Sequence, residues 1–172
     1  PDVVMFQAQK LLGYDDPRLF EELSDTVEAG LQRLYSDQHV DGGWGWFVND
    51  KSDNLISAYA VLGMVEAKGA GWAVDDNVLR KALEGLRAQS VEGKTPWWEL
   101  NRQAFLHYMR AHAGQIIRRT ENKELVFDLG SAITLFDQRD RMNLDAQAFL
   151  AMAFRIITPN AHHSVTLMED IK

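Results

Sequence analysis

Apolar residues recur at helical spacing along almost the whole chain of 172 residues. Between positions 17 and 34, four leucines and a valine occupy positions 19, 23, 27, 31 and 34, at steps of four, four, four and three. This spacing places them on one face of a helix, where they form a buried stripe. We find no convincing alternation of apolar and polar residues, the pattern that is typical of strands. The sequence therefore predicts an all-α fold.

Glycine, aspartate and proline divide this pattern into seven or eight helices, at positions where such residues start or stop a helix. The expected helices are 3–12, 17–34, one from the N-cap Asp53 to Gly69 or Gly71, one from about Asp75 to Leu86, one from the N-cap Asn101 to about Gly114, 121–137, 144–157 and a short one from His162. A chain of this length is typical of one domain, so we expect residues 1–172 to form a single all-α domain.

Composition excludes several classes of function. The chain has 25 acidic and 18 basic residues, a formal net charge of -7, which disfavours a nucleic-acid partner. It has no cysteine, so it can form neither a disulfide nor a thiolate zinc site nor a thioester. Its longest apolar runs, such as 57–65, are too short to span a membrane. We expect no cofactor and no metal.

The most unusual segment is the run Asp41, Gly42, Gly43, Trp44, Gly45, Trp46 and Phe47. Glycines allow backbone conformations that are closed to other residues, and the aromatic side chains are large apolar surfaces that must lie against something. We interpret the run as a tight turn whose tryptophans close one end of a helical core, or contact a neighbouring domain. A platform on which sugars or isoprenoids stack is the alternative.

Four segments resemble the thioester-containing domain of bacterial alpha-2-macroglobulins. Residues 31–46 are similar to that family's Gln-x-x-Asp-Gly-Gly-Trp-Gly-Trp loop and the turn before it, and residues 57–68 resemble the helix that follows. Residues 104–109 and 145–154 resemble two further helices of the same domain. The loop alone is less specific, because squalene-cyclase and prenyltransferase repeats use comparable loops.

This resemblance implies a partial α/α toroid of paired antiparallel helices. In the family, a Cys-x-Glu-Gln motif forms an internal thioester, and cleavage of a bait region by a protease releases it to acylate the attacker. Residues 1–4 resemble the segment that follows this motif, so we expect the thioester just before Pro1. The histidine that complement-type relatives place between loop and helix is absent from residues 48–52.

Other polar residues have structural interpretations that we prefer to catalytic ones. We expect His39 to be a solvated loop residue, and His162–His163 to be an exposed helix start rather than a metal site. His107 and His112 are five residues apart, a poor spacing for shared ligation on a helix.

The charged pairs are explained in the same way. Asp15–Asp16 and Asp75–Asp76 lie where a helix needs a cap, which accounts for them without catalysis. Asp50 and Asp53 fall short of the aspartate clusters of isoprenoid enzymes. We expect two short basic runs, Arg118–Arg119 and 139–141, to be solvated loops.

The resemblance implies a non-enzymatic scaffold: the structural core of a broad-spectrum endopeptidase inhibitor, secreted or in the periplasm and cell envelope. Its partners would be other domains of the parent protein and, through the parent, target proteases. The rival hypothesis is an α/α-toroid enzyme of terpene-cyclase or polysaccharide-cleaving type, which requires carboxylates converging on a cavity.

Overall fold

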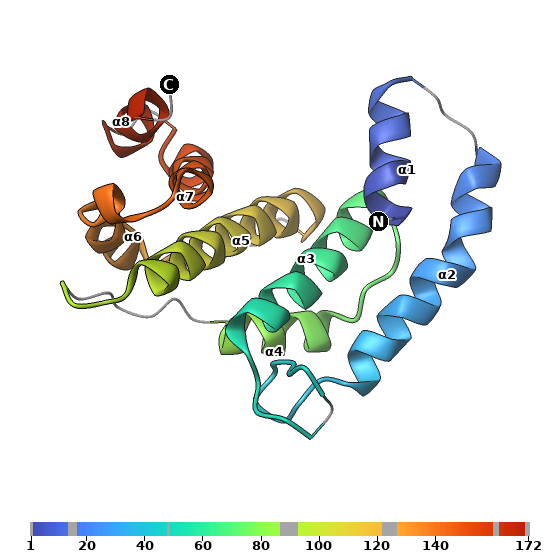
Figure 1. Ribbon diagram of the computed structural model, residues 1–172. Helices are drawn as coiled ribbons and strands as arrows, with labels where there is room; N and C mark the ends of the chain where they lie inside the picture. The colour runs from blue at the N-terminus through green and yellow to red at the C-terminus, as the bar shows by residue number, and fades with distance from the viewer. Residues whose placement is uncertain are drawn as a thin grey trace. The chain divides into compact units, whose positions relative to one another are not determined.

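The regular structure of the described residues is entirely helical. The computed structural model describes residues 2–13, 17–47, 49–86, 93–121, 127–159 and 162–170. The elements are α1 (Asp2–Leu11), α2 (Pro17–Ser36), α3 (Asn54–Ala70), α4 (Asp76–Gly85), α5 (Trp97–Glu121), α6 (Leu129–Phe136), the short 3-10 helix η1 (Arg139–Arg141), α7 (Leu144–Ile157) and α8 (His162–Asp170). This confirms the predicted all-α class and the predicted number of helices (Figure 1).

The chain divides into two compact units, residues 1–85 and 86–172. In the first unit α1 and α2 lie side by side as a helical hairpin, and α3 contacts α1, α2 and α4 (Figure 1). One face of α3 is fully buried, with Ala58, Val61, Met64 and Val65 inaccessible to solvent. Helix α3 is therefore the central helix of this unit.

Trp72, just after α3, ties the other helices of the first unit together. Its side chain is buried, and its ring packs edge-on against Phe6 of α1 with the ring centroids 5.2 Å apart. The indole Nε1 donates a hydrogen bond of 3.1 Å to Ser24 Oγ of α2. A buried tryptophan needs such a partner for its N–H, so Trp72 fixes α1 and α2 as well as filling space.

Helix α3 begins and ends at the residues that the sequence predicts. Asp53 is the N-cap, and its carboxylate accepts hydrogen bonds from the backbone N–H groups of Leu55 and Ile56. Gly71 ends the helix with φ of 109°, in the left-handed region where glycine is favoured. Both predictions are confirmed.

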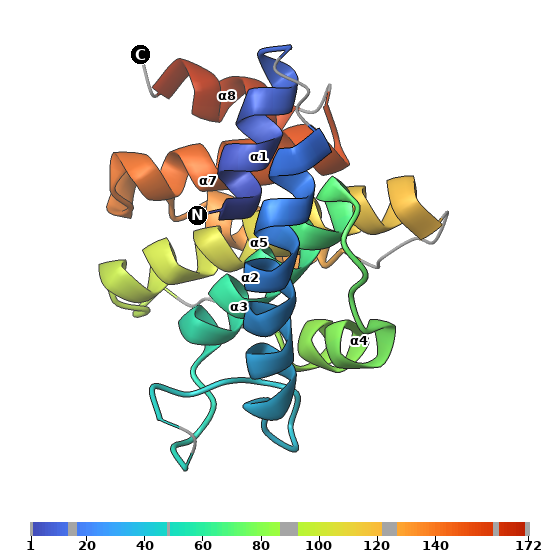
Figure 2. The same cartoon turned by 90° about the vertical axis from the view of Figure 1, so that its right-hand side faces the viewer.

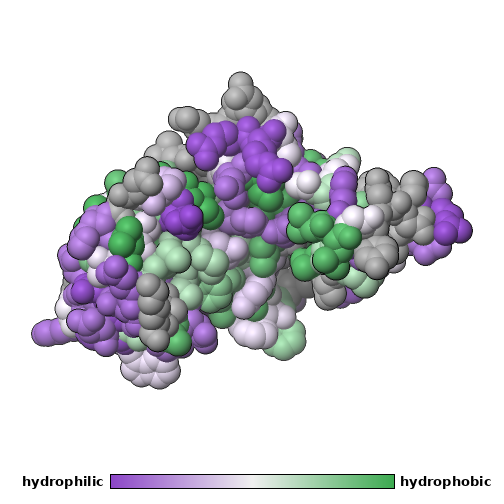
Figure 3. All heavy atoms as spheres, turned by 90° about the horizontal axis from the view of Figure 1, so that it is seen from above, coloured by the Kyte–Doolittle hydropathy of each residue, from purple (hydrophilic) through white to green (hydrophobic). Residues whose placement is uncertain are grey.

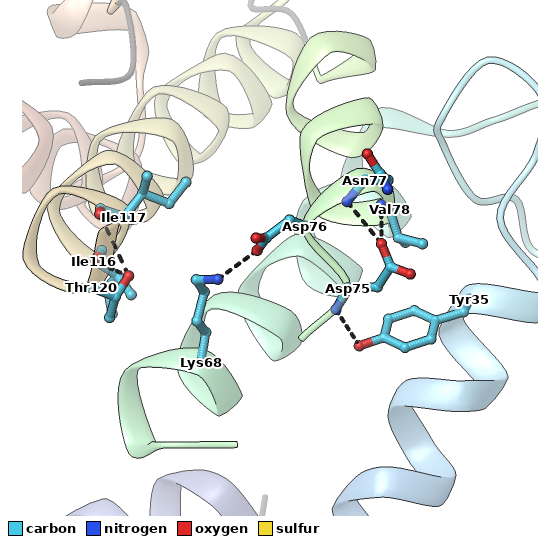
Figure 4. A network of polar contacts seen from close by, with 9 residues as sticks. All are labelled: Tyr35, Lys68, Asp75, Asp76, Asn77, Val78, Ile116, Ile117 and Thr120. Atoms are coloured by element: carbon cyan, nitrogen blue, oxygen red, sulfur yellow. Dashed lines mark hydrogen bonds and ion pairs between the residues drawn. The ribbon is translucent and has the colours of Figure 1, made fainter. Parts of the chain in front are cut away.

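The acidic pair at the start of α4 is a cap and an ion pair. Asp75 Oδ1 accepts from the N–H groups of Asn77 at 2.8 Å and Val78 at 3.2 Å, and its own N–H donates to Tyr35 Oη (Figure 4). Asp76 Oδ1 lies 2.7 Å from Lys68 Nζ. The structural interpretation of this pair is thus confirmed; Asp15–Asp16 lies outside the described residues.

In the second unit α5 contacts α6 and α7, and α7 contacts α8. Figure 2 views the chain from the side and shows α7 and α8 one above the other. The core of this unit is formed by buried residues of α5, α6, α7 and α8 and by the residue that follows η1. These residues are Leu100, Ala104, Ala132, Leu135, Phe136, Met142, Ala146, Leu150, Ala151, Phe154 and Leu167.

Two predicted boundaries of α5 are wrong. The helix begins at Trp97, before Asn101, and continues through Gly114 to Glu121. Ala113, Ile116 and Ile117 are buried on both sides of the glycine, and this packing outweighs the cost of about 1 kcal/mol that glycine imposes within a helix. Asn101 does not cap α5, because its side chain instead accepts a hydrogen bond from the N–H of Asn143 at 3.1 Å.

The remaining helices agree better with prediction. Helix α7 spans the predicted residues, and α8 begins at His162 as expected. The expected helix 121–137 is wrong at its start: Glu121 belongs to α5, and α6 begins at Leu129 after the N-cap Asp128. Residues 122–126 of that predicted helix lie outside the described residues.

The arginines of the 139–141 run are not merely solvated. Arg139 Nε lies 3.1 Å from Asp170 Oδ2 of α8, and its guanidinium lies 4.5 Å from the centre of the Phe136 ring. Arg141 donates to the carbonyl of Gly93 at 2.9 Å and to the carbonyl of Thr95. The prediction of a solvated loop is therefore wrong for Arg139, which is half-buried, whereas Arg141 is exposed as predicted and also binds a segment that is distant in sequence.

Apolar side chains also remain on the surface of each unit. In α1, Val4 and Leu11 are exposed, and in α7 and α8 Leu144, Val165 and Met168 are exposed. Figure 3 shows apolar patches beside strongly hydrophilic ones on the face seen from above. Apolar surface of this kind is suited to contact with other protein surfaces. No helix among the described residues is long and apolar enough to cross a membrane.

His107 in α5 is a buried polar residue whose protonation opposes folding. Its Nε2 lies 3.3 Å from Ser131 Oγ of α6, and its ring lies near Phe127. The pKa of His107 is lowered from 6.5 to about 4, chiefly by burial and to a smaller extent by the charge of Arg110, whereas Asp128 opposes the shift. The neutral imidazole is therefore the form that the core accommodates.

We expect the stability of the chain to fall between pH 7 and pH 4.5 in a way that depends on His107. The unfolded chain binds a proton near pH 6.5 and the folded chain only near pH 4, so stability is full above the unfolded pKa and is lost as the pH falls toward the folded one. The contribution is about 2 to 3 kcal/mol, measured by urea unfolding at the two pH values. In His107→Gln this part of the pH dependence should disappear, and an unchanged pH dependence would contradict the assignment.

Candidate functional site

The loop of residues 37–53 joins α2 to α3, and it carries all seven residues singled out in the sequence, Asp41 to Phe47 (Figure 1). It folds back on itself: the N–H of Gly42 donates to the His39 carbonyl, and the N–H of His39 donates to the Gly43 carbonyl, both at 2.9 Å. The segment is thus a tight turn, as the glycines predict.

Gly42 is required at the point where the loop touches α4. Its φ is 87°, in the left-handed region, and a Cβ at this position would lie 2.7 Å from the carbonyl carbon of Lys81 and closer still to its oxygen. Gln38 holds the same contact from the other side, since its Nε2 donates to the carbonyls of Gly42 at 3.0 Å and Val78 at 2.9 Å. The loop is therefore bound to α4 through backbone groups.

Asp41 serves the turn itself. Its Oδ1 accepts hydrogen bonds from Ser52 Oγ at 2.7 Å and from the N–H of Gly43 at 3.0 Å. The Ser52 hydroxyl above all, and then the Gly43 N–H, lower the pKa of Asp41. A carboxylate stabilised in its charged form is a poor general acid, so this residue fits a structural role.

His39 completes the network, and it is half-buried where the sequence predicted a solvated side chain. Its Nδ1 lies 2.9 Å from Ser52 Oγ. Because the single Ser52 proton goes to Asp41, the imidazole Nδ1 must carry the donated hydrogen. His39 Nε2 is buried and has no hydrogen-bond partner among the described residues. The fold-back of the turn leaves this side chain half-buried.

Trp44 is the residue that closes the core beneath the loop. It is 4% exposed, and its indole Nε1 donates a 2.9 Å hydrogen bond to the Leu34 carbonyl at the end of α2. Its backbone N–H donates to Ser57 Oγ at 2.9 Å, and its carbonyl accepts from the N–H of Asp53 at 2.8 Å. The polar groups of Trp44 are thus bound to both helices that flank the loop.

Ser57 anchors this arrangement from the first turn of α3. Its buried hydroxyl accepts from Trp44 N–H and lies 2.8 Å from the Asp53 carbonyl, to which it donates. We expect Ser57→Ala to lower the free energy of unfolding by about 1 to 3 kcal/mol, because the buried Trp44 N–H loses its acceptor. Urea unfolding measures the change. Ser36→Ala, which removes an exposed hydroxyl bonded to a carbonyl one turn earlier, is the control and should change stability by less than about 0.5 kcal/mol.

The other two aromatic residues of the loop face solvent. Trp46 is 72% exposed and Phe47 is 75% exposed. Together with Tyr59 and Ile56 of α3 they line an open groove of about 560 Å³, whose edge carries Arg33 and Asp37 of the α2 end. The expectation that the aromatics pack against something is met within the unit by Trp44, whereas Trp46 and Phe47 remain available to another surface.

The comparisons with known proteins agree with one another. The chain is 42% identical over 67 residues to alpha-2-macroglobulin of Thermotoga maritima, covering 39% of this chain and 4% of that protein. It is 29% identical over 115 residues to alpha-2-macroglobulin of Xylella fastidiosa, covering 66% of this chain and 7% of that protein. A homolog from Yersinia pestis is 28% identical over 100 residues, covering 58% of this chain and 5% of the homolog. These matches confirm that the sequence is similar to bacterial alpha-2-macroglobulins.

A solved structure of the family has the same fold. The crystal structure of native alpha-2-macroglobulin from Escherichia coli, spanning domain MG7 to the C-terminus, aligns with 92% of this chain at a TM-score of 0.65. The sequence identity is 16%, and the match covers 26% of that chain. No family model matches the sequence. The chain spans less than a tenth of the length of the curated relatives that it matches.

Two residues that hold the loop were not predicted from sequence. Gln38 was part of the quoted motif, but nothing in its position showed that its amide binds α4. Ser57 looked like one more small residue of an apolar helix, although a buried serine in a first turn is a signal for a bond to a nearby loop. Both act through partners that only the folded chain brings together.

The remaining polar candidates do not form a second site. Asp53 is used as a helix cap and Asp50 is exposed, so they do not act as a pair. His162 is exposed as expected, but His163 stacks on Phe154 with the ring centroids 5.0 Å apart. Within the described ranges, no three His, Asp or Glu side chains are grouped so as to hold a metal ion.

The last three candidate residues of the sequence analysis lie on α5. His112 stacks on Tyr108 within α5, and Arg118 and Arg119 are exposed in its last turn rather than in a loop.

Proposed function

We propose that this chain is part of the structural core of a macroglobulin-like, broad-spectrum endopeptidase inhibitor and carries out no chemistry of its own. The observation that carries the proposal is the sequence similarity to three bacterial alpha-2-macroglobulins, which reaches 66% of the chain. The fold shared with the Escherichia coli protein supports it. Inhibition would be an activity of the whole protein, located at the cell envelope or outside the cell.

The covalent step of such an inhibitor needs residues outside these 172. The chain contains no cysteine, so it cannot supply the sulfur of a thioester. Its role, as a single α/α-toroid domain, would be to keep a reactive bond dry until bait cleavage. Closely packed helices with a sealed loop suit this role, because water would hydrolyse the bond.

The loop supports the scaffold role because it has one aromatic side chain in the core and two on the surface. Trp44 and its hydrogen bonds seal the helical core, and the exposed Trp46 and Phe47 would contact another domain of the parent protein. An enzyme of the toroid class would need carboxylates that converge on a cavity. Asp37 is the single carboxylate among the residues lining this groove, and it lies 3.7 Å from Arg33.

Peptidase inhibition by the full-length protein tests the proposal. The protein encoded by the gene is mixed with peptidases of trypsin, chymotrypsin and elastase specificity, and cleavage of a large protein substrate and of a small chromogenic peptide is followed. We expect cleavage of the large substrate to be suppressed for peptidases of more than one specificity. Heat-unfolded protein at the same concentration is the control. Undiminished cleavage by all three peptidases would overturn the proposal.

A further inference from the structure

The exposed aromatic groove beside the loop has a specific chemical character. Trp46, Phe47 and Tyr59 are each more than half exposed, and all three line it. Their ring faces carry partial negative charge, which attracts cations as well as apolar groups. Single exposed aromatics are ordinary, but three of them around one groove of about 560 Å³ form a surface that selects its occupant.

The unit that carries the groove is predominantly acidic. The loop of residues 37–53 contains four aspartates and a single lysine. Residues 1–85 contain fifteen acidic and seven basic residues, a formal net charge of -8. An acidic partner would be repelled from this unit, and a basic one attracted to it.

One carboxylate lies directly at the groove. Asp37 is a lining residue, and its Oδ2 lies 3.7 Å from Arg33 Nε, whose side chain is 85% exposed. An exposed ion pair at this distance contributes little, so a guanidinium or ammonium group from a partner can replace Arg33 at Asp37. The groove thus combines aromatic faces with a carboxylate at its edge, which is the combination that binds a basic side chain with an apolar stem.

We infer that this groove binds a polypeptide segment in which an arginine or lysine is flanked by apolar residues, supplied by another domain of the parent protein. The basic head would lie at Asp37, and the flanking apolar side chains would lie on Trp46, Phe47 and Tyr59. The inference rests on the proposed scaffold function in one respect, because that function places the bound segment in another domain of the parent protein. The preference for a basic and apolar segment follows from the groove residues alone.

Titration of the 172-residue chain with short peptides tests the inference. Blocked peptides with arginine, citrulline or glutamate between two leucines are added at up to millimolar concentration, and the indole N–H resonances are followed by NMR. We expect the arginine peptide to shift the Trp46 resonance saturably, and the citrulline peptide to bind about tenfold more weakly, because it keeps the shape and loses the charge. The glutamate peptide should not bind.

Four variants make the result specific. Trp46→Ala and Asp37→Asn should weaken binding of the arginine peptide, whereas Arg33→Ala should strengthen it by freeing Asp37. Trp97→Ala removes another exposed tryptophan, in the second unit, and should leave binding unchanged. Equal binding of the citrulline peptide, or no saturable shift of Trp46, would overturn the inference. A shift caused by an oligosaccharide and not by the arginine peptide would show a sugar platform instead and would also overturn it.

Failure of this inference is distinguishable from failure of the proposed function. A full-length protein that suppresses peptidases, together with a groove that ignores the arginine peptide, retains the inhibitor function and loses the basic partner. Conversely, if the chain binds the arginine peptide but the full-length protein inhibits no peptidase, the inference about the groove is retained and the inhibitor function is lost.

Discussion

Replacement of Trp44 by alanine should destabilise the chain by about 3 to 5 kcal/mol, the cost of removing a large buried aromatic side chain from a core. The indole is 4% exposed and bonded to the Leu34 carbonyl, so the variant leaves both a cavity and a carbonyl without its donor. For a domain of ordinary stability this is a large part of the total free energy of unfolding. Urea unfolding followed by circular dichroism measures the change.

Trp46→Ala is the matched control for this prediction. The residue lies two positions away and is the same type, but its side chain is 72% exposed. We expect its removal to change the free energy of unfolding by no more than about 0.5 kcal/mol. Equal destabilisation by the two variants would show that the loop does not divide its tryptophans between core and surface.

Gly42→Ala should cost about 3 to 5 kcal/mol, for two reasons that act together. The backbone at this position is left-handed, with φ of 87°, which is strained for any residue with a Cβ. The new Cβ would also overlap the backbone carbonyl of Lys81, which cannot rotate away as a side chain can. The loop would have to leave α4, and Gln38 would lose its two acceptors.

Gly30→Ala is the control for the Gly42 variant. Gly30 lies within α2, and no atom is within 4 Å of the position its Cβ would take. Alanine is the better helix former, so this variant should gain about 0.5 to 1 kcal/mol. Thermal and urea unfolding of the two variants should therefore differ in sign, and a destabilised Gly30→Ala or a neutral Gly42→Ala would contradict the account.

Local signals were sufficient to predict much of the fold. Asp53 and Gly71 bound α3 because a cap and a left-handed glycine act on the nearest backbone groups. The start of α8 at His162 follows from the residues just before it, which stop α7. Such features depend on a few neighbouring residues, so the sequence contains them directly.

Features decided by distant contacts could not be predicted in the same way. Gly114 signals a helix end, yet buried residues on both sides keep α5 helical. Asn101 was predicted to cap α5, but its side chain instead accepts a hydrogen bond from the backbone N–H of Asn143. Arg139 and Arg141 looked solvated because their partners, Asp170 and the 93–95 segment, lie far away in sequence.

The loop shows both kinds of feature. Its glycines predicted a tight turn, and Gly42 is indeed held in a conformation that glycine favours. The sequence did not indicate which tryptophan is buried, because the answer depends on acceptors at Leu34 and Ser57, in the two flanking helices. Nor did it indicate that His39 is hydrogen-bonded to Ser52.

Hydrogen exchange of the loop amides, measured by NMR on the 172-residue chain in increasing urea, tests the central claim most directly. If the loop is a fixed part of the helical core, the hydrogen-bonded amides of His39, Trp44 and Asp53 should exchange only when the α3 amides do, with the same dependence on urea. Exchange of these three amides by local opening that does not depend on urea would contradict the claim, because it would describe a loop that moves independently of the core.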